Sequence, residues 1–157
     1  RFLFSFIGGG VRKKEVTKFK QMFKLENIRQ HPFQPRSSFH VSIGSSDIQV
    51  VIMGQNQVGF THPNKIYGAM LLGKPILYIG PTPSHISDIL NKLPGNIIAN
   101  HGAAERIVRK LKEFSELNSE EQQAIGIKNR EFALRFFDST QLKSKLADVI
   151  EQKDAIY

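Results

Sequence analysis

Two segments of the sequence have residue types and spacing that could hold a phosphate group. In the first, Gly8–Gly10 follow a short apolar run and precede the cationic residues Arg12, Lys13 and Lys14. A glycine turn lets the backbone approach an anion closely, and the start of a following helix favours negative charge. The spacing matches neither GxGxxG nor a P-loop, so a plain tight turn is the alternative reading.

The second segment is Pro63-Asn64-Lys65, at the expected start of a helix. Pro63 suits the first helical positions, where its missing N–H is not needed, and Asn64 then lies near the cap. Lys65 would fall in the first turn, where the helix dipole disfavours a cation. An anionic ligand would offset that cost, whereas a side chain that points into solvent is the alternative reading.

Other reactive residue types give weaker signals. The sequence predicts no metal site, because no metal-ligand spacing such as HExxH occurs among His31, His40, His62, His85 and His101. The chain has no cysteine, which excludes disulfides, thiol nucleophiles and thiolate metal sites. Ser84-His85 lacks the GxSxG context of a nucleophile, so Ser84 is expected to cap a helix.

Alternating apolar and amphipathic runs predict the elements that position these residues. Strands are expected at residues 1–7 (a buried one), 27–31, 48–53, 75–79 and 96–99. Helices are expected at residues 15–25, 37–46, 64–72, 84–93 and 103–117, then from a capping box at Ser119 through Phe132 and Phe136, and last from Asp138 or Ser139 through Leu142, Leu146 and Ile150. This alternation predicts an α/β, Rossmann-like, doubly wound parallel sheet with a helical C-terminal end. Ligands bind at the carboxyl ends of such strands, which here lead into residues 8–12, 54–65 and 80–85.

The length of the chain limits the number of domains and the kind of protein that it can form. A chain of 157 residues predicts a single domain, 1–157, and its apolar start without Met indicates a fragment of a longer protein. No apolar run approaches the roughly 20 residues that span a bilayer.

Positive charge is concentrated at the N-terminal end of the chain. Residues 1–36 hold nine Lys/Arg and two Asp/Glu, a net charge of +7, whereas residues 37–157 hold thirteen Lys/Arg and twelve Asp/Glu, a net charge of +1. The basic end could meet phosphate-bearing ligands, acidic lipid or nucleic acid, or could be a solvated lysine face.

Residues 62–81, HPNKIYGAMLLGKPILYIGP, resemble the donor-binding segment of family-four glycosyltransferases with the GT-B fold, of the exopolysaccharide and lipopolysaccharide type. Residues 1–10 resemble the second strand and glycine turn of the C-terminal domain of that family. Residues 31–54 and 84–90 also correspond. The resemblance covers nearly the whole chain, which would be that domain without its first strand and helix.

The resemblance implies a retaining, metal-independent hexosyltransferase that takes its sugar from a UDP- or GDP-type nucleotide sugar and uses no other cofactor. The nucleotide sugar would be the partner of this domain, and nucleic acid would not. An N-terminal domain of the parent chain would hold the acceptor, which is often lipid-linked in this family. A cytoplasmic protein is expected, peripheral at the membrane through its parent chain, with no turnover by this fragment alone.

Carried over residue by residue, the resemblance makes Lys65 the catalytic residue, which stabilises charge on the departing diphosphate. The other donor-binding residues that it implies are Gly9 and Gly10 at the diphosphate, Phe33, Gln34 and Pro35 near the base, Pro63 and Asn64 at the phosphate-facing helix start, Tyr67 and Gly68 near ribose and phosphate, and His62 as a polar contact. The two glutamates of the family pattern fall on Phe60 and Gly68, so the usual ribose-binding carboxylate is absent.

Two other functions fit parts of the sequence. Nucleotide-sugar 2-epimerases share the GT-B fold, but they need acidic and basic catalytic side chains that the middle segment lacks. A non-catalytic module could instead bind nucleotide, or bind nucleic acid through its basic first 36 residues, with a steep salt dependence in the latter case.

Overall fold

The computed structural model describes residues 2–138, 140, 143–144 and 147–148. The chain divides into two compact units, residues 1–45 and 46–157. Of the last predicted helix, Ser139, Leu142, Leu146 and Ile150 lie outside the described residues. Asp138 is described, and its Oδ1 accepts a hydrogen bond of 3.0 Å from the Thr140 N–H.

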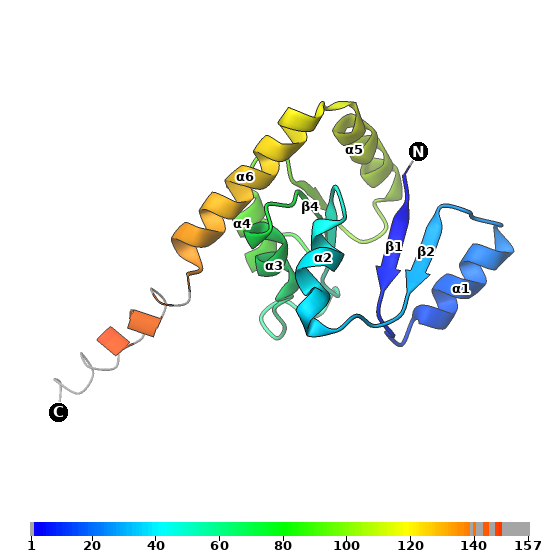
Figure 1. The fold of residues 1–157 in the computed structure, drawn as a ribbon, viewed down its shortest axis with the longest axis horizontal. Helices are drawn as coiled ribbons and strands as arrows, with labels where there is room; N and C mark the ends of the chain where they lie inside the picture. The colour runs from blue at the N-terminus through cyan, green and yellow to red at the C-terminus, as the bar shows by residue number, and fades with distance from the viewer. Residues whose placement is uncertain (1, 139, 141–142, 145–146, 149–157) are drawn as a thin grey trace. The chain divides into compact units, whose positions relative to one another are not determined.

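The first unit is a βαβ unit followed by short helical turns. It contains β1 (Phe4–Ile7), α1 (Lys13–Met22), β2 (Ile28–His31), the 3₁₀ turn η1 (Arg36–Ser38) and α2 (Phe39–Gly44). β1 and β2 are parallel, so α1 is the crossover, and it lies alongside β2 (Figure 1). The Thr17 hydroxyl donates to Gln30 Oε1 at 2.9 Å and ties α1 to β2.

The prediction that the first strand is buried is wrong. All four residues of β1 are exposed, and α1 has no buried residue. A two-stranded sheet with one short helix has too few neighbours to cover both of its faces. The apolar composition of residues 1–7 therefore correctly predicts a strand, but it does not predict that the strand is exposed.

The second unit is a three-stranded parallel sheet with helices packed on it. It contains β3 (Gln49–Ile52), α3 (Lys65–Leu71), β4 (Ile76–Ile79), α4 (His85–Leu90), β5 (Ile97–Ala99), α5 (Ala104–Glu116) and α6 (Ser119–Phe136). The strand order is β3-β4-β5, and the central β4 carries the fully buried Tyr78. α3 packs against α6, which runs beside it in Figure 1. Each of the five strands of the two units lies within its predicted range.

Helix α6 begins one residue earlier than the sequence predicts. Its cap is Asn118, whose Oδ1 accepts from the Glu121 N–H at 3.0 Å, while Glu121 Oε2 accepts from the Asn118 N–H at 2.8 Å. Asn118 has extended backbone angles, and Ser119 is already helical. The pattern that predicts a capping box is therefore right, but its register is shifted by one residue. No helix in the described part of the chain is long and apolar enough to cross a bilayer.

Candidate functional site

The carboxyl ends of β3 and β4 bring two loops of the second unit to one edge of its sheet. β3 and β4 are parallel neighbours in register from Gln49–Ile76 to Ile52–Ile79. The segments that follow them, residues 53–64 and 80–84, therefore leave the sheet on the same side. In parallel α/β sheets this edge is where ligands bind. His62, Lys65 and His85 are at or next to the ends of these two segments.

Three aromatic rings stack at this edge. The His62 ring lies between Tyr67 and His85, with centroid distances of 5.1 and 4.2 Å and interplanar angles of 9° and 20°. His62 Nε2 also forms a hydrogen bond with the Tyr67 hydroxyl. The Tyr67 ring meets Phe137, just beyond α6, edge to face at 4.7 Å. The stack therefore links the loop before α3 to the start of α4.

Partial desolvation shifts the pKa values of two groups in this stack, the exposed His62 and the half-buried Tyr67. Desolvation, and secondly the positive charge of a protonated His85, lower the pKa of His62. Desolvation raises the pKa of Tyr67. At neutral pH both groups are therefore uncharged, and the tautomer of His62 decides which of them donates the hydrogen bond. His85 Nε2 is buried and has no hydrogen-bond partner in the described part of the chain.

A pH titration should reveal the lowered pKa of His62. The unfolded chain takes up a proton near the ordinary histidine pKa of about 6.5, before the folded chain does, so folding loses stability as pH falls through that range. We expect a His62→Gln variant to lose less stability than the parent between neutral and mildly acidic pH, measured by urea unfolding. His40→Gln, at an exposed position of α2, is the control. A parent and His62→Gln variant with the same pH dependence would contradict this assignment.

Lys65 lies in the first turn of α3, as the sequence predicts, and is its first residue. The residue is exposed, although partial desolvation of its ammonium group lowers its pKa, and none of the ion pairs among the described residues includes it. Asn64 occupies the N-cap position, but its side chain makes no capping hydrogen bond. Pro63 contributes its carbonyl oxygen, which accepts from the Ile66 N–H at 3.1 Å.

The positions of the two family glutamates carry no acid in the structure either. Phe60 is 90% exposed, and Gly68 is a half-buried residue of α3. Residues 54–72 include no Asp or Glu at all. Any polar contact from this segment to a ligand hydroxyl must therefore come from neutral or cationic groups.

Five of the predicted site residues belong to the first unit. Gly9 and Gly10 are exposed, and a Cβ on either would meet no atom within 4 Å. The left-handed backbone angle of this turn is at Gly8, with φ +119°, so the glycine required by geometry is the one before the predicted pair. Phe33 is 82% exposed, Gln34 donates to the Pro32 carbonyl at 3.2 Å, and Pro35 is exposed.

Sequence reasoning missed the contribution of His85. The sequence assigns His85 no role in a site, whereas Ser84 beside it is a cap, as expected, and accepts from the Ser87 N–H at 3.2 Å. The signal that could have found His85 is its place after β4, next to the loop that follows the neighbouring β3. Phe137 gives no such signal, because it reaches Tyr67 only through the packing of α6 on α3.

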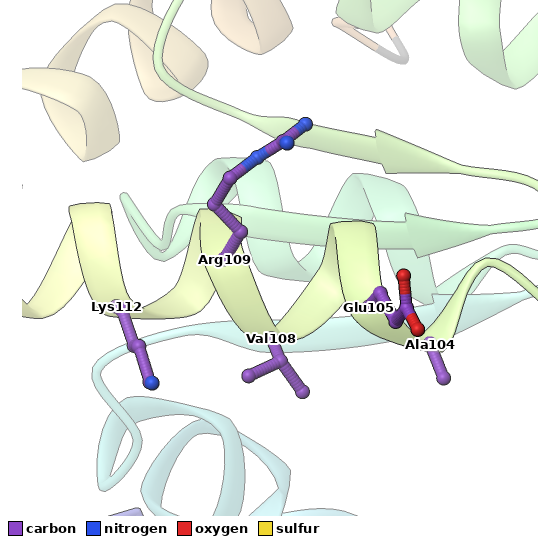
Figure 2. Close-up of a pocket in the computed structure, with 5 residues that line it drawn as sticks. All are labelled: Ala104, Glu105, Val108, Arg109 and Lys112. Atoms are coloured by element: carbon purple, nitrogen blue, oxygen red, sulfur yellow. The ribbon is translucent and has the colours of Figure 1, made fainter.

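A shallow depression elsewhere on the second unit is not part of this site. Its lining residues all come from α5: Ala104, Glu105, Val108, Arg109 and Lys112. Figure 2 shows Val108 and Lys112 extending to one side of the helix and Arg109 to the other. Because one helix forms the whole lining, the depression has no opposing wall that could enclose a ligand.

Comparison with known proteins finds likeness in structure alone. No protein-family model matches the sequence, and no curated protein matches it either. Among solved structures, Anabaena HepE in complex with UDP-glucose matches at a TM-score of 0.74 and 15% identity, over 94% of this chain and 40% of HepE. WaaG, a glycosyltransferase involved in lipopolysaccharide biosynthesis, matches at a TM-score of 0.67 and 16% identity, over 94% of this chain and 38% of WaaG.

A third match is S. aureus TarM in a complex with Fondaparinux, α-GlcNAc-glycerol and UDP. Its TM-score is 0.71 at 17% identity, over 93% of this chain and 28% of TarM. The chain thus spans less than half of the length of each of these proteins. At such low identity the likeness shows the fold and nothing finer. The predicted fold class is confirmed: the chain has a Rossmann-like α/β architecture that matches part of a GT-B fold.

Proposed function

We propose that this chain is the nucleotide-sugar-binding part of a retaining glycosyltransferase of polysaccharide or glycolipid biosynthesis. The observation that carries the proposal is the fold match over 94% of the chain to a protein in complex with UDP-glucose. The resemblance of residues 62–81 to a donor-binding segment points to the same function. Because two of the matched structures contain UDP, we take a UDP-sugar as the donor.

In this proposal Lys65 acts on the leaving group. Transfer breaks the bond between the sugar C1 and the diphosphate oxygen and forms a bond from C1 to an acceptor hydroxyl oxygen, whose proton ends on the released phosphate. Negative charge grows on the diphosphate as it leaves, and a fixed cation stabilises that charge. Lys65 is an exposed residue in the first turn of α3, and it takes part in none of the ion pairs among the described residues, so its ammonium group can meet an anion there.

The ring stack would act by positioning. It holds the loop before α3 through His62 and Tyr67, and Tyr67 lies two residues after Lys65. His85 supports the stack from its other side, with its ring against that of His62 at 4.2 Å between centroids. His62 uses Nε2 for Tyr67, which leaves its Nδ1 for a ligand in the absence of the family glutamates. The acceptor and the rest of the enzyme would come from other parts of the parent chain.

Calorimetric titration of the 157-residue chain with UDP, GDP and UDP-glucose tests the proposal. We expect saturable binding of UDP and a loss of about tenfold or more in affinity for Lys65→Ala, the usual effect of removing one charged contact. Lys92→Ala, at an exposed position after α4, is the matched control and should bind like the parent. Circular dichroism must show that each protein is folded. A folded parent that binds neither nucleotide, or binding that is unchanged in Lys65→Ala, would contradict the proposal.

The epimerase alternative receives no support from the site. Such an enzyme needs carboxylates around the reacting sugar, and residues 54–72 contain none.

A further inference from the structure

Helix α1 carries an apolar stripe that its own unit does not cover. Phe19, Met22 and Phe23 are 53, 73 and 56% exposed. Their spacing puts them on one face of the helix, and the Phe19 and Phe23 rings are in contact at 4.7 Å between centroids. The helix attaches to its sheet through another face, where Thr17 binds Gln30. Packing within the unit therefore does not account for the stripe.

Cationic side chains surround this stripe. On a helix, Lys18 and Lys20 fall on either side of it, and Lys24 follows at its C-terminal end. None of the ion pairs among the described residues uses these three lysines. Residues 2–45 hold eight Lys/Arg and two Asp/Glu, which gives the unit a net charge of +6. The surface thus combines exposed apolar groups with a strong positive field.

We propose that this face of α1, defined by Phe19, Met22, Phe23 and the lysines 18, 20 and 24, binds the surface of a bilayer that contains anionic lipid. The three apolar side chains would enter the boundary between headgroups and acyl chains. The lysine ammonium groups would reach the lipid phosphates while their alkyl stems cover apolar surface. This proposal is independent of the proposed sugar-donor site.

The same charges could attract nucleic acid, but the stripe favours lipid. A phosphate backbone needs only cations, and it gives three exposed apolar side chains at helical spacing nothing to bury against. A bilayer interface accepts both classes of side chain at once, as amphipathic helices with a lysine-rich polar face show.

The absence of tryptophan from the chain allows a direct experiment. Met22→Trp places a single reporter in the stripe, and Val108→Trp places one at an exposed position of α5 as a control. Each protein is mixed with vesicles of phosphatidylcholine, alone or with phosphatidylglycerol. We expect a blue shift of the Met22→Trp fluorescence with the vesicles that contain phosphatidylglycerol and none with the neutral vesicles. The shift should be weaker at high salt, and Val108→Trp should show no shift with either kind of vesicle.

Vesicle cosedimentation can then separate the contributions of the lysines and of the apolar side chains to membrane binding. A triple variant, Lys18→Gln with Lys20→Gln and Lys24→Gln, should bind anionic vesicles about a hundredfold more weakly, since each lysine near such a surface contributes roughly a factor of five. Phe19→Ser with Phe23→Ser should also weaken binding at constant charge. The control triple, Lys92→Gln with Lys112→Gln and Lys128→Gln, makes the same charge change at exposed positions of the second unit.

Several results would overturn the proposal. They are no shift by folded Met22→Trp on anionic vesicles, equal binding to neutral and anionic vesicles, or equal losses in the two lysine triples. A DNA duplex that binds through the α1 lysines while vesicles do not bind would overturn it in favour of nucleic acid. Circular dichroism of each variant ensures that none of these results comes from unfolding.

Discussion

Replacing Gly126 with alanine is expected to cost the second unit about 3 kcal/mol of unfolding free energy, near the upper end of the usual range for overpacking. The new Cβ would lie 1.9 Å from the Gly73 carbonyl oxygen and 2.7 Å from its carbonyl carbon. Both are backbone atoms, so no side-chain rotation can relieve the clash. The higher helix propensity of alanine offsets only about 1 kcal/mol. Helix α6 would have to move away from α3.

Urea unfolding followed by circular dichroism measures this effect. Gly44→Ala is the matched control, because a Cβ there meets nothing within 4 Å and the backbone angle is not left-handed. We expect that control to leave stability unchanged or slightly higher. A Gly126→Ala midpoint equal to that of the parent would show that α3 and α6 do not approach each other as closely as the structure has them.

The second large effect is expected at Asn129, a fully buried polar residue of α6. Asn129 and Asn96 exchange two amide hydrogen bonds, of 2.8 and 2.9 Å. Asn129 Nδ2 also donates to the Lys74 carbonyl at 2.9 Å. Asn129→Ala would leave that carbonyl and one Asn96 donor without these bonds, and would open a cavity. Since each buried unsatisfied group costs about 1–3 kcal/mol, we expect a loss of about 3 kcal/mol.

A double-mutant cycle distinguishes the amide pair from general packing. Asn96 also accepts from the Ile76 N–H and donates to the Leu93 carbonyl, each at 2.9 Å, so Asn96→Ala is costly on its own. The double variant should be less destabilised than the sum of the two single variants, by about 1 kcal/mol or more. Strictly additive losses in urea unfolding would mean that the two amides do not stabilise each other.

The positions of helices and strands can be predicted from the sequence where neighbouring residues alone determine them. β3 and β4 are apolar, β-branched runs with breakers after them, and both lie within their predicted ranges. The start of α6 is predicted one residue too late, because the predicted capping box begins at Ser119 and the structure has its cap at Asn118. The extended backbone at Asn118, which marks the cap, is a feature of the folded chain. The burial of β1 was not predictable, since burial depends on neighbours rather than on the strand itself.

The candidate site likewise has one part that adjacent residues predict and one part that depends on the fold. Lys65 at the start of α3 follows from Pro63 and Asn64, which are adjacent to it in sequence. The stack of Tyr67, His62 and His85 depends on two loops that meet only because β3 and β4 are neighbours in the sheet. One sequence gives the residue types in those loops, but the contact between them is a property of the folded sheet.

The close approach of Gly73 and Gly126 also has a consequence for the order of events during synthesis. α3 carries Lys65, yet the helix that packs on it is the last one of the described core, more than fifty residues downstream. When a ribosome has released the chain only as far as α5, the side of α3 that α6 will cover still faces water. The proposed donor site is therefore encoded upstream of its supporting helix and acquires that support only after α6 has been synthesised.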